Sequence, residues 1–105
     1  MEFEFIYDER LGIHVPNLYH DWEQYNDDIQ SQILLNWENI RGNIPDRIFD
    51  LETLINIKQE NLNNEENFQR SCELNSEIAE LASIINDLWL WYRSSESITV
   101  SKAHQ

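Results

Sequence analysis

The sequence contains few of the residues that interrupt secondary structure or cross-link a chain. Its 105 residues include two glycines, two prolines and one cysteine. Because turns use Gly and Pro heavily, this scarcity argues against a β-sandwich or barrel and favours a few long helices. The single Cys72 excludes an internal disulfide, so the fold must depend on its apolar core.

Basic residues are also scarce. Seven Lys and Arg stand against twenty Asp and Glu, which gives a formal net charge of -13. This balance argues against direct binding to nucleic acid or to an anionic membrane, since both require clustered positive charge. The apolar run at residues 88–92 is far shorter than the ~20 residues of a membrane span. The acidic N-terminus lacks the features of a secretory signal, so we expect a cytoplasmic protein.

The apolar residues that are present suffice for one small core. Hydrophobic residues make up 41% of the chain and aromatic residues 11%, more than a disordered acidic chain carries. The length permits a single domain. We therefore predict an all-α fold, a small three-helix or four-helix bundle that contains an antiparallel helical hairpin and a short N-terminal strand or extended arm.

The N-terminus alternates between apolar and polar residues. Phe3, Phe5 and Tyr7 share one face of residues 2–7, a period of two that is typical of a strand. A lone strand needs a partner, and the candidates are residues 98–100, a second subunit or another protein. An arm whose aromatic rings dock on the helices fits the same pattern. We assign residues 1–16 to this strand or arm.

The rest of the chain predicts helices. The first helical region covers residues 17–42, with a pause at residues 26–28 and Gly42 as the glycine that ends it. A helical hairpin follows at residues 45–62 and 67–93, and residues 94–105 form a flexible tail. The apolar spacing that supports these regions is carried by Leu18, Trp22, Tyr25, Ile29, Ile33, Trp37 and Ile40, then Ile48, Leu51, Ile55 and Leu62, then Leu74, Ile78, Leu81, Ile85, Leu88 and Tyr92.

Residues 48–84 resemble a UVR motif, the short helical hairpin of UvrB and UvrC that also occurs in adaptors of Clp-type proteolysis. The residues that carry the resemblance are Leu51, Glu52 and Ile55, and then Glu65, Asn67–Leu74, Glu77, Ile78, Glu80 and Leu81. The family usually has Arg-Asp where this chain has Asn75-Ser76. The resemblance implies a hairpin that pairs with a hairpin of a partner protein. It also implies that Phe68 closes the loop and that Ser71 and Cys72 let the helices approach.

Motifs for chemistry are missing from the sequence. It has no Gly-rich phosphate loop, no Cys-x-x-Cys, no Gly-x-Ser-x-Gly and no Glu-x-x-His. We therefore predict no enzyme activity, no cofactor and no metal site. The aromatic residues at the end of the last helix point instead to binding, because Trp89 and Trp91 are two residues apart and cannot both face one seam.

Two functions remain open at this stage. The first is a protein-interaction module or adaptor, or a homodimer, that docks through a helical hairpin face. Its predicted contact residues are Phe68, Leu74, Ile78, Leu81, Trp89 and Trp91. The alternative is a small acidic inhibitor, nucleic-acid mimic or immunity protein that blocks a basic partner through Asp21, Glu23, Asp27 and Asp28.

Overall fold

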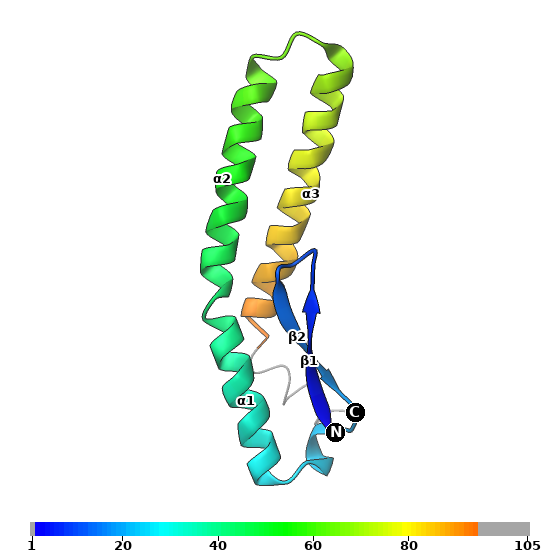
Figure 1. Ribbon diagram of the computed structural model, residues 1–105, viewed down its shortest axis with the longest axis vertical. Coiled ribbons are helices and arrows are strands. Elements are labelled where there is room, and N and C mark those ends of the chain that lie inside the picture. Colours follow the sequence, from blue (N-terminus) through cyan, green and yellow to red (C-terminus); the bar gives the residue numbers. More distant parts are fainter. Residues whose placement is uncertain (1, 95–105) are drawn as a thin grey trace.

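The computed structural model describes residues 2–94, which form an elongated α+β fold (Figure 1). A two-stranded sheet comes first, followed by one 3₁₀ turn and three α-helices. The elements are β1 (Phe3–Asp8), β2 (Ile13–Leu18), η1 (Trp22–Gln24), α1 (Asp27–Arg41), α2 (Ile44–Asn63) and α3 (Phe68–Tyr92).

The two strands form an antiparallel β-hairpin, with Phe3 opposite Leu18 and Asp8 opposite Ile13. We call residues 9–12, which connect the strands, the β-tip. Gly12 adopts a φ of 76° there, a value that residues with a Cβ rarely adopt. Its N–H donates to the Asp8 carbonyl over 2.7 Å, and the Asp8 carboxylate accepts the N–H of Leu11 at 2.9 Å. The chain therefore reverses direction at Gly12 and continues into a second strand, although the sequence pattern suggested that Gly12 ends the strand region.

The strand that pairs with β1 is therefore the next segment of the chain, which was not among the predicted partners. Residues 13–18 pair with β1, whereas residues 98–100 lie outside the described residues. Pro16 does not prevent this pairing, because it lies opposite Phe5 in a strand that is at the edge of a two-stranded sheet.

The first helix begins later than the predicted residue 17. Leu18 ends β2 and Trp22 lies in η1, so their helical spacing with Tyr25 was a coincidence. The α-helix starts after Asn26, whose side chain accepts the Ile29 N–H at 2.9 Å and so caps the first turn. The predicted pause at residues 26–28 is therefore the true start of α1.

The predicted all-α bundle is wrong, because the β-hairpin makes the fold α+β. Its three helices also fail to form a bundle. α1 and α2 run end to end along the long axis, and α2 and α3 lie side by side and antiparallel (Figure 1). Gly42 causes no reversal between α1 and α2, since its φ of -62° and ψ of -20° are right-handed helical values. The β-hairpin lies where a third bundle helix was expected.

The main core lies where the β-hairpin, α1, α2 and α3 meet. It contains Leu11 and Ile13 from the β-hairpin, Trp37 from α1, Ile44, Ile48 and Leu51 from α2, and Ile84 and Leu88 from α3. A second cluster joins Trp22, Tyr25 and Ile33 at the far end of α1. The Trp37 Nε1 atom is buried there and has no hydrogen-bond partner among residues 2–94.

The helical hairpin is closed by a short polar loop. α2 ends at Asn63, and Asn67 caps α3 by accepting the Arg70 N–H at 2.9 Å. Although α3 reaches 25 residues, none of the helices in the described chain carries an apolar stretch sufficient to cross a lipid bilayer.

Candidate docking surface

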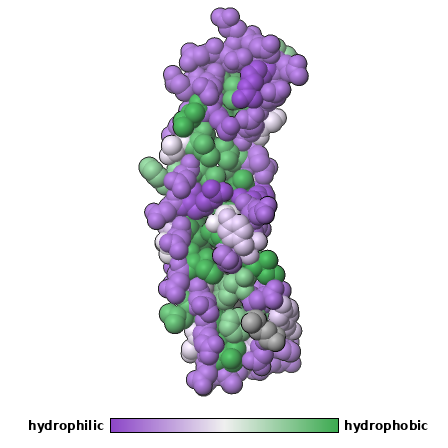
Figure 2. Space-filling model, viewed as in Figure 1, coloured by the Kyte–Doolittle hydropathy of each residue, from purple (hydrophilic) through white to green (hydrophobic). Residues whose placement is uncertain are grey.

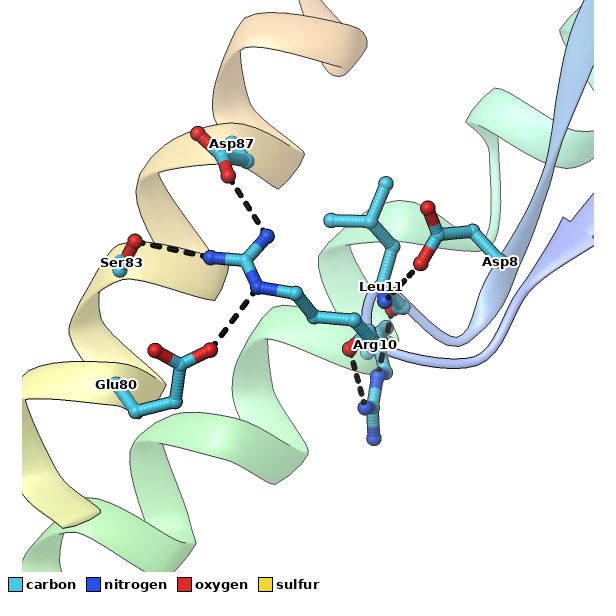
Figure 3. Close-up of polar contacts among 7 residues, drawn as sticks. Asp8, Arg10, Leu11, Glu80, Ser83 and Asp87 are labelled. Atoms are coloured by element: carbon cyan, nitrogen blue, oxygen red, sulfur yellow. Dashed lines mark hydrogen bonds and ion pairs between the residues drawn. The ribbon is translucent and has the colours of Figure 1, made fainter.

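The β-tip is fastened to α3 by one arginine (Figure 3). Arg10 donates to Asp87 at 2.8 Å, to Ser83 at 2.9 Å and to Glu80 at 3.0 Å. These bonds, the one to Asp87 most strongly and then that to Glu80, raise the pKa of Arg10. Each of the three guanidinium nitrogens of Arg10 thus donates to a side chain on one side of α3.

The same β-tip is fastened to α2 through its backbone. Arg47 donates from Nε to the Leu11 carbonyl at 2.9 Å, and the Leu11 side chain is buried in the main core. A Cβ placed on Gly12 would lie 2.5 Å from the Arg47 Nε atom. The β-tip therefore fills the space between α2 and α3 with a buried apolar side chain and a cation beside it.

The carboxylates that hold Arg10 belong to a longer row on α3. Glu73, Glu77, Glu80 and Asp87 follow one another at intervals of four, three and seven residues, which places them on one side of the helix. Beyond the β-tip, Glu77 accepts from Lys58 of α2 at 2.6 Å.

Arg70 occupies the far end of this row. It donates to Glu73 at 3.0 Å and to Glu77 at 3.1 Å. The Lys58 bond, followed by the Arg70 bond, lowers the pKa of Glu77 below its ordinary value. The row of carboxylates therefore holds cations along its whole length.

Apolar side chains of α2 lie exposed opposite this row. Leu54 is seven residues after Arg47, which is two helical turns, so it projects on the side of α2 that contacts the β-tip. Leu54 is 43% exposed and Ile57, one turn later, is 53% exposed. Asp50 is exposed one turn before Leu54.

We call this surface the distal face. It consists of Asp50, Leu54 and Ile57 on α2 and of Glu73, Glu77 and Glu80 on α3. Figure 2 shows apolar atoms on the half of the helical hairpin above the β-hairpin, where they reach the left edge of the view, with hydrophilic atoms at the loop end and on the right. The apolar surface that the β-tip covers on one half of the helical hairpin is thus open on the other half.

The predicted contact residues do not form one surface. Phe68 is 83% exposed at the start of α3 and does not close the loop as the resemblance implies, whereas Leu74 is buried between the helices. Ile78 and Leu81 are half-buried. Of these four, Leu81 packs against the main core. Leu74 is therefore unable to contact a partner without opening the helical hairpin.

The two tryptophans at the end of α3 separate as their spacing requires. The Trp91 ring packs against Trp37 with centroids 5.5 Å apart, on the core side. Trp89 is 41% exposed and meets the Tyr92 ring edge-on at 5.5 Å. The Arg41 guanidinium lies over the Tyr92 ring, 4.2 Å from its centroid. This end of α3 therefore offers one exposed ring, Trp89, held in place by its neighbours.

The four carboxylates of the predicted acidic surface lie together near the start of α1. Asp21, Glu23, Asp27 and Asp28 are all exposed, and none makes an ion pair within residues 2–94. Asp27 and Asp28 occupy the first turn of α1, where negative charge favours the helix. Their position thus also serves the stability of α1.

A cavity of about 430 Å³ lies beside the β-tip. Its walls are Asp8, Arg10, Leu11, Asp87, Leu90, Trp91 and Ser94. The polar walls already bond within the fold, Arg10 to Asp87 and Asp8 to the Leu11 N–H. Among residues 2–94 there is also no group of three His, Cys, Asp or Glu side chains placed to hold a metal ion.

No protein-family model, curated protein or solved structure matches the chain. The resemblance to the UVR hairpin therefore stays a prediction.

Sequence reasoning missed Leu54 and Ile57 of the distal face and Arg10 of the β-tip. Leu54 and Ile57 fall outside the heptad seam of α2, and an apolar residue outside a seam is a signal of an exposed apolar surface. Arg10 is the only basic residue of the first forty, which marked it as a candidate for pairing with the acidic helices.

Proposed function

We propose that this chain is a non-enzymatic protein-interaction module that docks a partner protein on the distal face. The observation that carries the proposal is the exposure of Leu54, which lies about 60° around α2 from the buried Leu51, with Ile57 exposed about 60° farther around the same side. Apolar side chains that are grouped and rimmed by polar residues are typical of protein-binding surfaces.

Another exposed ring on α2 serves as a contrast. Phe49 is 68% exposed, but it lies about 140° around the helix from Leu54. Its neighbours at helical spacing include Asp46, Glu52 and Thr53, all exposed and polar. An isolated apolar residue of this kind is common on protein surfaces and carries no partner. The distal face differs because Leu54 lies on the side of α2 where Arg47 contacts the β-tip, two turns earlier in the helix.

In this function the chain binds its partner and catalyses no reaction. The partner is another protein, and the compartment is the cytoplasm. The single Cys72, exposed on α3, supports a reducing compartment.

A second candidate function is that of an acidic inhibitor. The exposed carboxylates of Asp21, Glu23, Asp27 and Asp28, which make no ion pair within residues 2–94, favour it, since such a group would attract a basic protein from a distance. This surface lies at the opposite end of the molecule from the helical loop, so the two functions predict contacts at different places (Figure 1).

The proposal is tested by comparing variants of the full chain as bait in an extract of the source cells. A protein that docks on the distal face is expected to be retained by the wild type and by Phe49→Asp, and lost with a Leu54→Asp and Ile57→Asp double variant. The retained protein is then identified by mass spectrometry and purified, and its affinity for each variant is measured by calorimetry.

The outcomes separate the two functions. If the purified partner binds the double variant as tightly as it binds the wild type, docking on the distal face is wrong. If it loses affinity only when Asp21, Glu23, Asp27 and Asp28 are neutralised, the inhibitor function is supported instead.

A further inference from the structure

The side of α3 that faces away from the β-tip carries a row of four apolar residues. We call this row the reverse stripe, and it consists of Ile78, Ala82, Ile85 and Trp89. Its members follow one another at intervals of four, three and four residues, the spacing with which one helix packs along another. Each is two residues from Glu80 or Asp87, which is about 160° around the helix. Because Glu80 and Asp87 bind Arg10, the reverse stripe lies on the opposite side from the β-tip.

The reverse stripe is open to solvent in the described chain. Trp89 is 41% exposed and Ala82 is exposed, whereas Ile78 and Ile85 are half-buried. The Trp89 ring does not stand alone, since it meets the Tyr92 ring edge-on at 5.5 Å. The stripe therefore offers a supported aromatic ring at one end, an isoleucine at the other and a small residue between them.

The side of α3 that carries the reverse stripe has no carboxylate. The carboxylates of α3 all belong to the row that faces the β-tip, namely Glu73, Glu77, Glu80 and Asp87. The polar residues beside the stripe are uncharged, namely Ser71, Asn75 and Asn86. On α2, Glu52 lies on the stripe side, about 140° around the helix from Arg47. Within the helical hairpin, the reverse stripe thus has one carboxylate beside it.

This distribution of charge makes a second copy of the chain a suitable occupant. Each copy carries a net charge of -13, so two copies repel each other wherever their acidic surfaces meet. Contact through the reverse stripes directs the carboxylates of both α3 helices away from the interface. The electrostatic cost of pairing is therefore smaller here than on the side of the β-tip.

The spacing of the stripe also matches a copy of itself. When two α3 helices pack antiparallel with the centre of contact midway between residues 82 and 85, Ala82 lies opposite Ile85 of the second copy. In the same register Ile78 lies opposite Trp89 of the second copy. The small Ala82 leaves room for the larger Ile85 side chain. Both contacts occur twice, as a two-fold axis requires.

The helical hairpin supplies a face of sufficient size for this pairing. The 20 residues of α2 extend over roughly 30 Å, and two helices side by side are roughly 20 Å wide. The resulting face of about 600 Å² is of the same order as the ~800 Å² that each partner buries in a stable interface. Two such hairpins packed face to face place the half-buried isoleucines in a shared four-helix core.

We propose that the chain forms a homodimer in which the reverse stripes of two copies pack antiparallel around a two-fold axis. The inference goes beyond the proposed function, because it concerns the other side of the helical hairpin. Leu54 of the distal face lies on the side of α2 that contacts the β-tip, so the dimer leaves the distal face open. The assembly then presents two distal faces to partner proteins.

Sedimentation equilibrium of the full chain tests the inference, since a dimer has twice the 12.6 kDa mass of one copy. We expect wild-type chain to be mostly dimeric at about 50 μM. The dissociation constant is expected to fall at least about threefold between roughly 0.05 M and 0.5 M salt, because salt screens the repulsion between the two acidic copies. A dimer held by opposite charges would instead weaken as salt is added.

A carboxylate placed in the stripe identifies the interface. Ala82→Glu puts two negative charges near the two-fold axis and is expected to weaken the dimer at least about tenfold. Ser76→Glu is the matched control, because Ser76 is exposed on α3 about 120° around the helix from Ala82. Ser76→Glu and the distal-face variant Leu54→Asp leave the dissociation constant unchanged. Circular dichroism confirms that each variant is folded.

A pair of opposite charges tests the register. Ile78→Lys and Trp89→Glu are each expected to weaken the dimer, since each buries a charge without a partner. The double variant regains affinity, at least about threefold over the weaker single variant, because Lys and Glu then face each other across the interface.

Three outcomes would overturn the inference. The first is a wild-type chain that sediments as a 12.6 kDa monomer at about 0.5 mM in both salt concentrations. The second is equal weakening by Ala82→Glu and Ser76→Glu. The third is a dimer that dissociates with Leu54→Asp while Ala82→Glu has no effect. Binding of a partner protein at the distal face is measured separately and does not depend on these results.

Discussion

Gly12 is the residue on which the position of the β-tip depends. Its φ of 76° suits glycine, and a Cβ there would lie 2.5 Å from the Arg47 Nε atom that binds the Leu11 carbonyl. We expect Gly12→Ala to lower the free energy of unfolding by about 1–3 kcal/mol, as left-handed conformations cost residues with a Cβ. Urea unfolding followed by circular dichroism measures this change.

Gly42 provides the matched control for that substitution. Its φ of -62° is helical, and the nearest atom to an added Cβ is the Glu38 carbonyl oxygen at 3.5 Å. Gly42→Ala is therefore expected to raise the free energy of unfolding by about 0.5–1 kcal/mol. Equal losses for the two substitutions would contradict the account of the β-tip.

Single residues were also where the sequence was least informative about the site. Phe68 was expected to close the helical loop and is exposed, while Leu74 was expected to contact a partner and is buried. Apolar spacing places a residue on a face of a helix, but it does not tell which element covers that face. The β-tip, which covers part of α3 through Arg10, has no signal in the spacing of the helices.

At the scale of elements, the bridge between α2 and α3 carries a pH dependence. Lys58, and after it Arg70, lower the pKa of Glu77 below its ordinary 4.5. A carboxylate with a lowered pKa stabilises the fold above its unfolded pKa, and this contribution is lost as the pH falls through the folded value. We therefore expect Glu77→Gln to reduce the loss of stability on acidification below about pH 4.5.

Urea unfolding from about pH 7 to about pH 3 checks this expectation. Glu52→Gln is the control, because Glu52 is exposed on α2 and makes no ion pair within residues 2–94. The wild type and the control should lose stability in parallel, and Glu77→Gln should lose less. A Glu77→Gln curve as steep as that of the wild type would show that the bridge contributes nothing.

The local pattern of apolar residues predicted the secondary structure only in part. The sustained apolar repeat from Leu74 to Leu88 lies within α3, and the alternation of Phe3 and Phe5 lies in β1. Residues 13–18 were misread because Gly12 and Pro16 suggested an interruption, whereas Gly12 makes the turn and Pro16 is tolerated in the strand. The all-α prediction failed at this one segment, because strand pairing depends on a neighbour that periodicity does not reveal.

At the scale of the whole molecule, the length of the fold separates the three surfaces that a partner could use. The described chain extends over 60 × 23 × 22 Å. The helical loop lies at one end and the start of α1, with Asp27 and Asp28, at the other (Figure 1). The distal face lies between the helical loop and the β-tip, and Trp89 lies farther along α3. A partner that binds one surface will therefore leave the others exposed to solvent.

The acidic side chains that give the net charge of -13 have a different role at each of these surfaces. At the start of α1 they stabilise a helix N-terminus, and along α3 they bind Arg10, Lys58 and Arg70. Near Leu54 and Ile57, the exposed Asp50 makes no ion pair within residues 2–94, whereas Glu73, Glu77 and Glu80 are paired with Arg70, Lys58 and Arg10.

Hydrogen–deuterium exchange of the full chain, free and bound to the partner that it retains, tests the central claim most directly. The account predicts that binding slows exchange in residues 50–61 of α2 and 70–80 of α3, and leaves residues 21–28 and the end of α3 unchanged. Protection concentrated at residues 21–28, or at Trp89 and its neighbours with residues 50–61 unaffected, would contradict docking on the distal face.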